Sequence, residues 1–293
     1  MIRIGIYGFT FSKEMIFPGG KLIPIFSNLS SSKKNKVDGK QYVLSGFFIP
    51  KSNDYNQLSQ LTFDLSAALS FIEQKDVIVA GEIGKYESIE NLPKDYPKTL
   101  KSSRHSGSGK LVMEDAFSPD SRSKLLNLAM AKLTESANVE SDAFRTAFFK
   151  SMLKFREPIH YVDVSYYLLF SSLESLARHA LQNFKGKAPK IITEFLQGYG
   201  FEVEKENHIT PQRNIIHYSK LRNALFHNGI YKAYLDDNDS EIYLEDYFSN
   251  LNMLLPLVFL KVLEFDDGFI NWNSWIDRQA FKSPTKFEPI TKG

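Results

Sequence analysis

The chain has 293 residues, of which 36 are Lys or Arg and 34 are Asp or Glu, giving a formal net charge of +2 at pH 7. This near balance excludes the strong global basic field of many nucleic-acid-binding proteins, so contact with a polyanion would depend on local patches. The absence of cysteine excludes disulfides, zinc–thiolate sites and cysteine nucleophiles, and it is typical of a cytoplasmic protein. The most apolar run, residues 251–263, is too short to span a bilayer, so no membrane segment is expected.

Residues 1–118 are expected to form a small antiparallel β domain with an accessory or sensing role. Short apolar or alternating runs, separated by Gly and Pro, are typical of strands. These runs are residues 2–7, 21–26, 41–49 and 76–81. Pro24 cannot donate a hydrogen bond to a neighbouring strand, which favours a sheet edge for its run. Residues 61–71 are compatible with either a strand or a helix.

From Ser121 onward the period of the apolar residues changes from 2 to 3.6, which predicts helices. The change places a domain boundary near residues 116–121, followed by an all-α domain over residues 119–293. Helices are expected at about residues 121–137, 141–155, 159–181, 190–196, 210–229 and 241–264. Beyond them, Trp275 is expected to pack back on the helices.

The segment from Leu221 to Gly229 is the strongest candidate for a functional site. It ends a helical pattern whose apolar stripe includes Tyr218, Leu221 and Leu225. Gly229 is suited to the left-handed conformation that closes a helix, which places His227 in the last turn. Asn223, one turn earlier, is expected to hydrogen-bond the imidazole and fix its tautomer.

Arg222 and His227 are the residue types that phosphodiester chemistry needs. Histidine exchanges a proton near neutral pH, and the guanidinium of arginine stays charged and binds phosphate oxygens in a bidentate manner. The alternative from the local pattern is structural: a solvated arginine and a histidine that complements the helix dipole.

Glu174 stands in an apolar row of the helix expected at residues 159–181. A carboxylate in such a row needs a cationic partner or becomes protonated. Arg222 is the expected partner, and the ion pair would hold the guanidinium in position across the helices. The alternative is a solvated glutamate on the flank of the helix.

Two segments resemble HEPN domains. Arg222-Asn223-x-x-x-His227 is similar to the R-x4-6-H signature of that family. Tyr166–Leu176 resembles the preceding helix of the Apea-like HEPN branch, in which a Leu-Glu-x-Leu core recurs. The segments occur in the expected order, and the resemblance covers roughly residues 121–265.

The resemblance implies a helical bundle that forms a homodimer with a composite active site, and metal-independent cleavage of RNA without a cofactor. His227 would then transfer a proton or orient the ribose 2′-hydroxyl. Arg222 would stabilise the transition state, Asn223 would orient His227, and Glu174 would brace Arg222. A bacterial defence or toxin role is also implied, with an unidentified trigger sensed by the β domain.

A rival hypothesis is a non-catalytic HEPN-like bundle that acts as a dimerising adaptor or as a nucleotide- or RNA-binding module. The basic connection at residues 185–190 is either a solvated loop or a guide for a nucleic-acid backbone. A DNA-binding regulator ranks last, because Arg213, Lys220 and Arg222 do not share one face of a helix.

Overall fold

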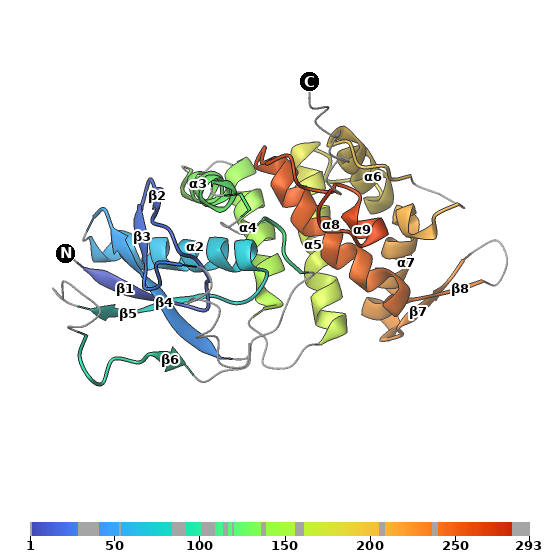
Figure 1. The fold of residues 1–293 in the computed structure, drawn as a ribbon. Helices are drawn as coiled ribbons and strands as arrows, with labels where there is room; N and C mark the ends of the chain where they lie inside the picture. Colours follow the sequence, from blue (N-terminus) through green and yellow to red (C-terminus); the bar gives the residue numbers. More distant parts are fainter. Residues whose placement is uncertain are drawn as a thin grey trace, which may run out of the picture.

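A sheet lies at one end of the molecule and a layer of helices at the other in the structure, a computed structural model (Figure 1). The residues that the structure describes are 2–28, 41–52, 54–83, 92–100, 109–113, 117–118, 120–135, 139–155, 161–204, 209–235 and 240–282. Mixed α/β architecture, with an antiparallel sheet near the N-terminus and helices after it, matches the predicted fold class at this coarse level.

The sheet is antiparallel between all neighbouring strands, in the order β2-β3-β4-β1-β5. Its strands are β1 (Arg3–Tyr7), β2 (Met15–Phe17), β3 (Gly20–Pro24), β4 (Tyr42–Pro50), β5 (Ile78–Ile83) and β6 (Thr99–Leu100). β6 pairs with the start of β4, on the side where β3 pairs with its end. The edge position predicted for the run containing Pro24 was wrong, because the three-residue strand β2 lies outside β3. The first residue of β2, Met15, pairs with Leu22, so β2 does not reach Pro24 and no neighbour needs an N–H from this proline on that side.

The run at residues 61–71 lies within a helix, α2 (Tyr55–Glu73). Helix α2 connects β4 to β5. These two strands run parallel to each other on either side of β1, so the chain must cross from one end of the sheet to the other between them. Many side chains of α2 are buried, including Leu65, Ala68 and Phe71. Burial on more than one side removes the polar face that would have marked the run as a helix.

The remaining helices form the second part of the chain. They are α3 (Ser121–Thr134), α4 (Val139–Leu153), α5 (Val162–Ala180), α6 (Ala188–Gly198), α7 (Ile215–Asn228), α8 (Leu244–Val262) and α9 (Ser274–Asp277). The prediction of an all-α C-terminal domain was wrong in one respect. Strands β7 (Lys232–Tyr234) and β8 (Glu241–Tyr243) form an antiparallel hairpin between α7 and α8. Trp275 is fully buried, as expected, and its carbonyl accepts a hydrogen bond of 2.7 Å from Asn250 of α8.

One hydrophobic core runs through both parts of the chain, from Ile4 of β1 to Trp275 of α9. Its centre is aromatic: the ring of Phe71 on α2 lies 5.1 Å from that of Phe148 on α4 and 5.9 Å from that of Phe259 on α8. The boundary expected near residues 116–121 remains a prediction, and no break in the buried cluster marks it.

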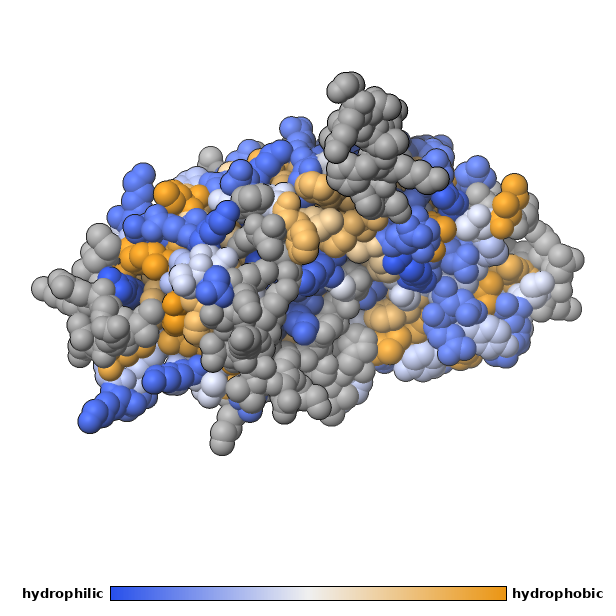
Figure 2. All heavy atoms as spheres, in the orientation of Figure 1, coloured by the Kyte–Doolittle hydropathy of each residue, from blue (hydrophilic) through white to orange (hydrophobic). Residues whose placement is uncertain are grey.

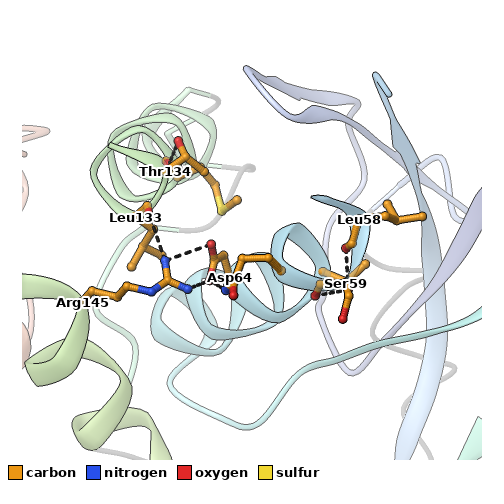
Figure 3. A network of polar contacts seen from close by, with 9 residues as sticks. Leu58, Ser59, Asp64, Leu133, Thr134 and Arg145 are labelled. Carbon is orange, nitrogen blue, oxygen red and sulfur yellow. Dashed lines mark hydrogen bonds and ion pairs between the residues drawn. The ribbon is translucent and has the colours of Figure 1, made fainter. Parts of the chain in front are cut away.

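An ion pair joins α2 to α4 beside this core (Figure 3). Arg145 donates to both carboxylate oxygens of Asp64, at 3.1 Å for the Nη1–Oδ2 pair, and Nη1 also donates to the carbonyl of Leu133 at 2.7 Å. Asp64 is buried and accepts a further 2.8 Å bond from Gln60. Three helices are therefore tied together at one guanidinium.

Candidate functional site

α7 carries the predicted motif and is capped at both ends. The side chain of Asn214 accepts the N–H of Ile216 at 3.0 Å, and Gly229 adopts a left-handed conformation with φ of 64°. The predicted stripe of Tyr218, Leu221 and Leu225 is buried. The helix begins later than the predicted Thr210, because the preceding residues Pro211–Arg213 form a 3₁₀ turn.

His227 lies in the last turn of α7, as expected, and its side chain is exposed. The predicted hydrogen bond from Asn223 to its ring is absent among the contacts of these described residues. The side-chain oxygen of Asn223 instead accepts a 3.0 Å bond from Nη1 of Arg222. Asn223 is therefore engaged with the guanidinium of Arg222 rather than with the imidazole of His227.

Arg222 is half-buried on the side of α7 that faces α5 and α6. Its guanidinium carbon lies 5.7 Å from the centre of the Phe226 ring, within reach of a cation–π interaction. Its Nε–H is buried and has no hydrogen-bond partner within the described part of the chain. Five residues correspond to about 140° around an α-helix, so Arg222 and His227 point to different sides.

Glu174 does not form the predicted ion pair with Arg222. Its carboxylate binds Arg178, one turn further along α5, with Nε and Nη2 at 2.9 and 2.7 Å. The i,i+4 spacing makes this cation available within the same helix, so it competes successfully with a partner on another helix. The sequence already contains this spacing, and our prediction overlooked it.

Arg178 also holds the loop that leads into α6. Its Nη1 donates to the carbonyls of Asn183 and Gly186, at 3.3 and 3.1 Å. The side chain of Asn183 in turn accepts the N–H of Gly186 at 3.0 Å. Glu174 and Arg178 together therefore fix the position of the segment that ends in Lys187, the residue before the first turn of α6.

A pocket of about 940 Å³ lies between α5, α6 and α7. Glu174, Arg222 and Asn223 all line it, so three of the four predicted site residues are brought together, whereas His227 is not part of its wall. The other charged residues in the wall are Arg178, Lys187, Lys190 and Lys220. Two of these, Lys187 and Lys190, come from the basic connection for which the sequence left the alternatives of loop and backbone guide.

Charge in this wall is strongly unbalanced. Among the described residues that line it, five cationic side chains face one carboxylate, and that carboxylate is paired with Arg178. The contact between Lys190 and Glu194 is long, at 3.7 Å, and exposed, so it neutralises little. A chain with a net charge of only +2 concentrates positive charge at this place.

His217, the other histidine of α7, has a structural role. It is buried, its Nε2 lies 2.9 Å from Nδ2 of Asn214, and its Nδ1 lies 2.7 Å from the hydroxyl of Tyr247 on α8. These contacts tie the start of α7 to α8, at the end of the helix opposite His227.

Apolar side chains are exposed where α7 ends and α5 begins. The rings of Phe226 and Tyr167 are tilted by 35° with their centres 4.1 Å apart, which places the two helix ends side by side. The exposed apolar residues on the segments that meet here are Tyr161, Val162, Val164, Phe226, Ile230 and Tyr231. We call this set the α5–α7 apolar patch. Figure 2 shows apolar surface in orange at the lower edge, where Figure 1 places the end of α7 and the start of β7.

Across the described ranges, no three His, Asp or Glu side chains are grouped so as to hold a metal ion. None of the helices in these ranges has the length and apolar character needed to cross a membrane. No family model, no curated protein and no solved structure gives a significant match to the chain.

Proposed function

We propose that the protein is a metal-independent endoribonuclease of the HEPN type, and that its active site is completed by a second copy of the chain. The observation that carries this proposal is the arrangement on α7. Arg222 faces a cationic pocket, and His227 stands exposed at the capped end of the same helix, next to the α5–α7 apolar patch.

The divergence of the two side chains is the reason for invoking a second copy. Within one chain Arg222 and His227 point to different sides of α7, so one phosphate is poorly placed to meet both. Two-fold symmetry brings the same surface of each copy together and supplies each residue twice. Burial of the α5–α7 apolar patch would then favour association.

The proposed chemistry is an internal transesterification of RNA. The ribose 2′-hydroxyl attacks the adjacent phosphorus, the bond to the 5′-oxygen of the next nucleotide breaks, and the products are a 2′,3′-cyclic phosphate and a 5′-hydroxyl. His227 removes the proton from the 2′-hydroxyl or returns one to the leaving oxygen. Arg222 stabilises the charge that develops on the phosphate.

The roles of the remaining site residues follow from their contacts. Asn223 holds Nη1 of Arg222, so it orients the arginine. Glu174 acts indirectly: it binds Arg178, and Arg178 in turn fixes the loop before α6 that borders the pocket. The resemblance of residues 166–176 and 222–227 to HEPN domains would further imply a defence or toxin role, in which cleavage of cellular RNA halts bacterial growth.

The test is cleavage of a mixed RNA by the purified protein in the presence of EDTA. His227→Ala should lower the rate by about 10²- to 10⁴-fold, the usual contribution of a general acid or base. Asn228→Ala, an exposed neighbour in the same helix turn, is the matched control. Products should carry a cyclic phosphate, and a 2′-deoxy substitution at the cleaved position should block the reaction.

Equal cleavage by His227→Ala, or loss of cleavage on adding EDTA, would exclude this function. Absence of cleavage by the unaltered protein would favour the second candidate, a non-catalytic HEPN-like module that dimerises and binds RNA or nucleotides. One observation favours that candidate: no described side chain hydrogen-bonds the imidazole of His227.

A further inference from the structure

We infer that the pocket between α5, α6 and α7 is a binding site for a nucleoside phosphate, with the phosphate at its cationic rim and the base or ribose against its apolar wall. That the bound unit belongs to an RNA strand rests on the proposed function. The chemistry of the pocket itself does not depend on cleavage.

The size of the pocket fits a whole nucleotide unit. Its volume of about 940 Å³ lies at the upper end of the range of small-ligand sites, about 300–1,000 Å³. A single inorganic anion would leave most of it filled with water. The side chains of Phe170, Ile216 and Pro189 supply an apolar surface, and Ser219 and Asn223 supply polar groups.

The charge of the wall selects an anion. Lys187 and Lys190 lie at the entrance to α6, Lys220 lies on α7, and Arg222 stands beside it. Among the described residues of the wall, the one carboxylate is that of Glu174, and it is paired with Arg178. Lys220 also donates to the carbonyl of Tyr234 at 3.2 Å, a contact that leaves its positive charge in place. The N-terminal end of α6 adds the partial positive charge of the helix dipole.

The hydrogen bonds of Arg222 leave one edge of its guanidinium available. Nη1 donates to Asn223, whereas Nε is buried without a partner and no described contact uses Nη2. The Nε and Nη2 groups form an edge that matches two oxygens of one phosphate. An unpaired buried donor is unfavourable, so a rotation of Arg222 that brings this edge to a bound phosphate would remove that cost.

The rim of the pocket is fixed in advance rather than formed by a mobile chain. Arg178 binds the carbonyls of Asn183 and Gly186, and Glu174 holds Arg178 in place. A Cβ at Gly186 would lie 3.0 Å from Oδ1 of Asn183 and Cδ1 of Ile191, which is tighter than usual packing. The backbone at Lys187 is therefore already in place before a ligand binds, which spares the entropic cost of ordering the loop.

The experiment measures binding with the His227→Ala protein, in which the proposed cleavage is slowed enough for bound RNA to be measured. Fluorescence anisotropy of a labelled eight-nucleotide RNA is one arm, and calorimetric titration of adenosine 5′-monophosphate is the other. Lys187→Gln, Lys190→Gln and Lys220→Gln are compared with Lys185→Gln, which is exposed on the same loop and does not line the pocket. The three pocket variants should each weaken binding about fivefold or more, and each should reduce the slope of log K against log salt for RNA by about 0.7.

The pattern across the arms identifies the source of the ligand. Weaker binding of RNA alone indicates a unit within a strand, and weaker binding of both ligands or of the mononucleotide alone indicates a free nucleotide that fits the same pocket. Equal effects of all four lysine variants, or no effect of any, would overturn the inference. An active nuclease with unaltered binding in the pocket variants would refute the pocket and keep the proposed function, whereas pocket-dependent binding without any cleavage by the native protein would do the reverse.

Discussion

The carboxylate of Glu174 binds the guanidinium of Arg178, one turn along α5, through contacts of 2.9 and 2.7 Å. Both side chains are about four-fifths buried, at 19% and 20% exposed, so solvent screens this ion pair less than it would a pair on the surface. Arg178 also donates hydrogen bonds to two backbone carbonyls of the loop before α6. The shape of the cationic pocket thus depends on a contact within a single helix.

Arg178→Met should lower the free energy of unfolding by about 1–3 kcal/mol, because charge-assisted bonds to Glu174 and to two carbonyls are lost while the aliphatic stem is kept. Lys190→Met is the control, since its contact with Glu194 is exposed and such pairs contribute about 0–1 kcal/mol. Urea denaturation measures both values. Similar losses for the two variants would contradict the role given to Arg178.

Arg145→Met should destabilise the protein more than Asp64→Asn does. Removal of the cation leaves a buried carboxylate with only Gln60 as a described side-chain donor, at a cost of about 2–3 kcal/mol after allowance for the partial exposure of Arg145. The asparagine variant keeps one acceptor, and its cost should be about half as large. A double-mutant cycle measured by denaturation gives the coupling, and a reversed order of the two losses would refute this account.

Ile230→Asp should dissociate the proposed dimer by placing a charge within the α5–α7 apolar patch. The dissociation constant should rise at least about tenfold, since a buried charge without a partner is costly. Ile209→Asp is the matched control, because this isoleucine is 95% exposed and lies outside the patch. Sedimentation equilibrium measures the association, and a monomer for the unaltered chain at every concentration would remove the composite site.

Because of Lys154, the free energy of unfolding should change with pH above pH 7. Burial lowers the pKa of its ammonium to about 7, and its Nζ lies 2.6 Å from Oδ1 of Asn252. The unfolded chain, with an ordinary lysine pKa, binds more protons than the folded chain between pH 7 and about 10.5, so the free energy of unfolding rises with pH in this window. The slope should approach about 1.4 kcal/mol per pH unit.

Lys154→Met provides the comparison for that slope, because methionine fills similar space and does not titrate. The difference in unfolding free energy between the two proteins, measured at pH 7, 8 and 9, isolates the lysine from all other groups. A difference that stays constant across these pH values would show that burial does not lower the pKa of Lys154.

The sequence predicted elements that have one apolar and one polar side, and it failed where that contrast is missing. The stripe of α7 was found from Tyr218, Leu221 and Leu225, and the cap from Gly229. In contrast, α2 was ambiguous because Leu65 and its neighbours are buried between other elements. The hairpin of β7 and β8 was missed because strands of three residues are too short for an alternating pattern to emerge.

For the candidate site, too, the sequence predicted features within one helix better than contacts between helices. The positions of Arg222 and His227 on one helix followed from local spacing. The partner of Glu174 was assigned to Arg222 on another helix, although Arg178 stood at i+4. The pocket itself needed the structure, because Lys187 and Lys220 come from segments whose distance in space is set by the packing of α6 against α7.

The ring of Phe71 packs against that of Phe259, which is 188 positions later in the chain. During synthesis at about 5–20 residues per second, the apolar side of α2 therefore waits on the order of 10–40 s for its partner to leave the ribosome. Phe148 of α4 emerges earlier, but the side of the Phe71 ring that Phe259 covers lacks its partner until the end of this interval. While the rest of the chain is being made, the N-terminal part therefore exposes apolar surface of the kind that chaperones bind.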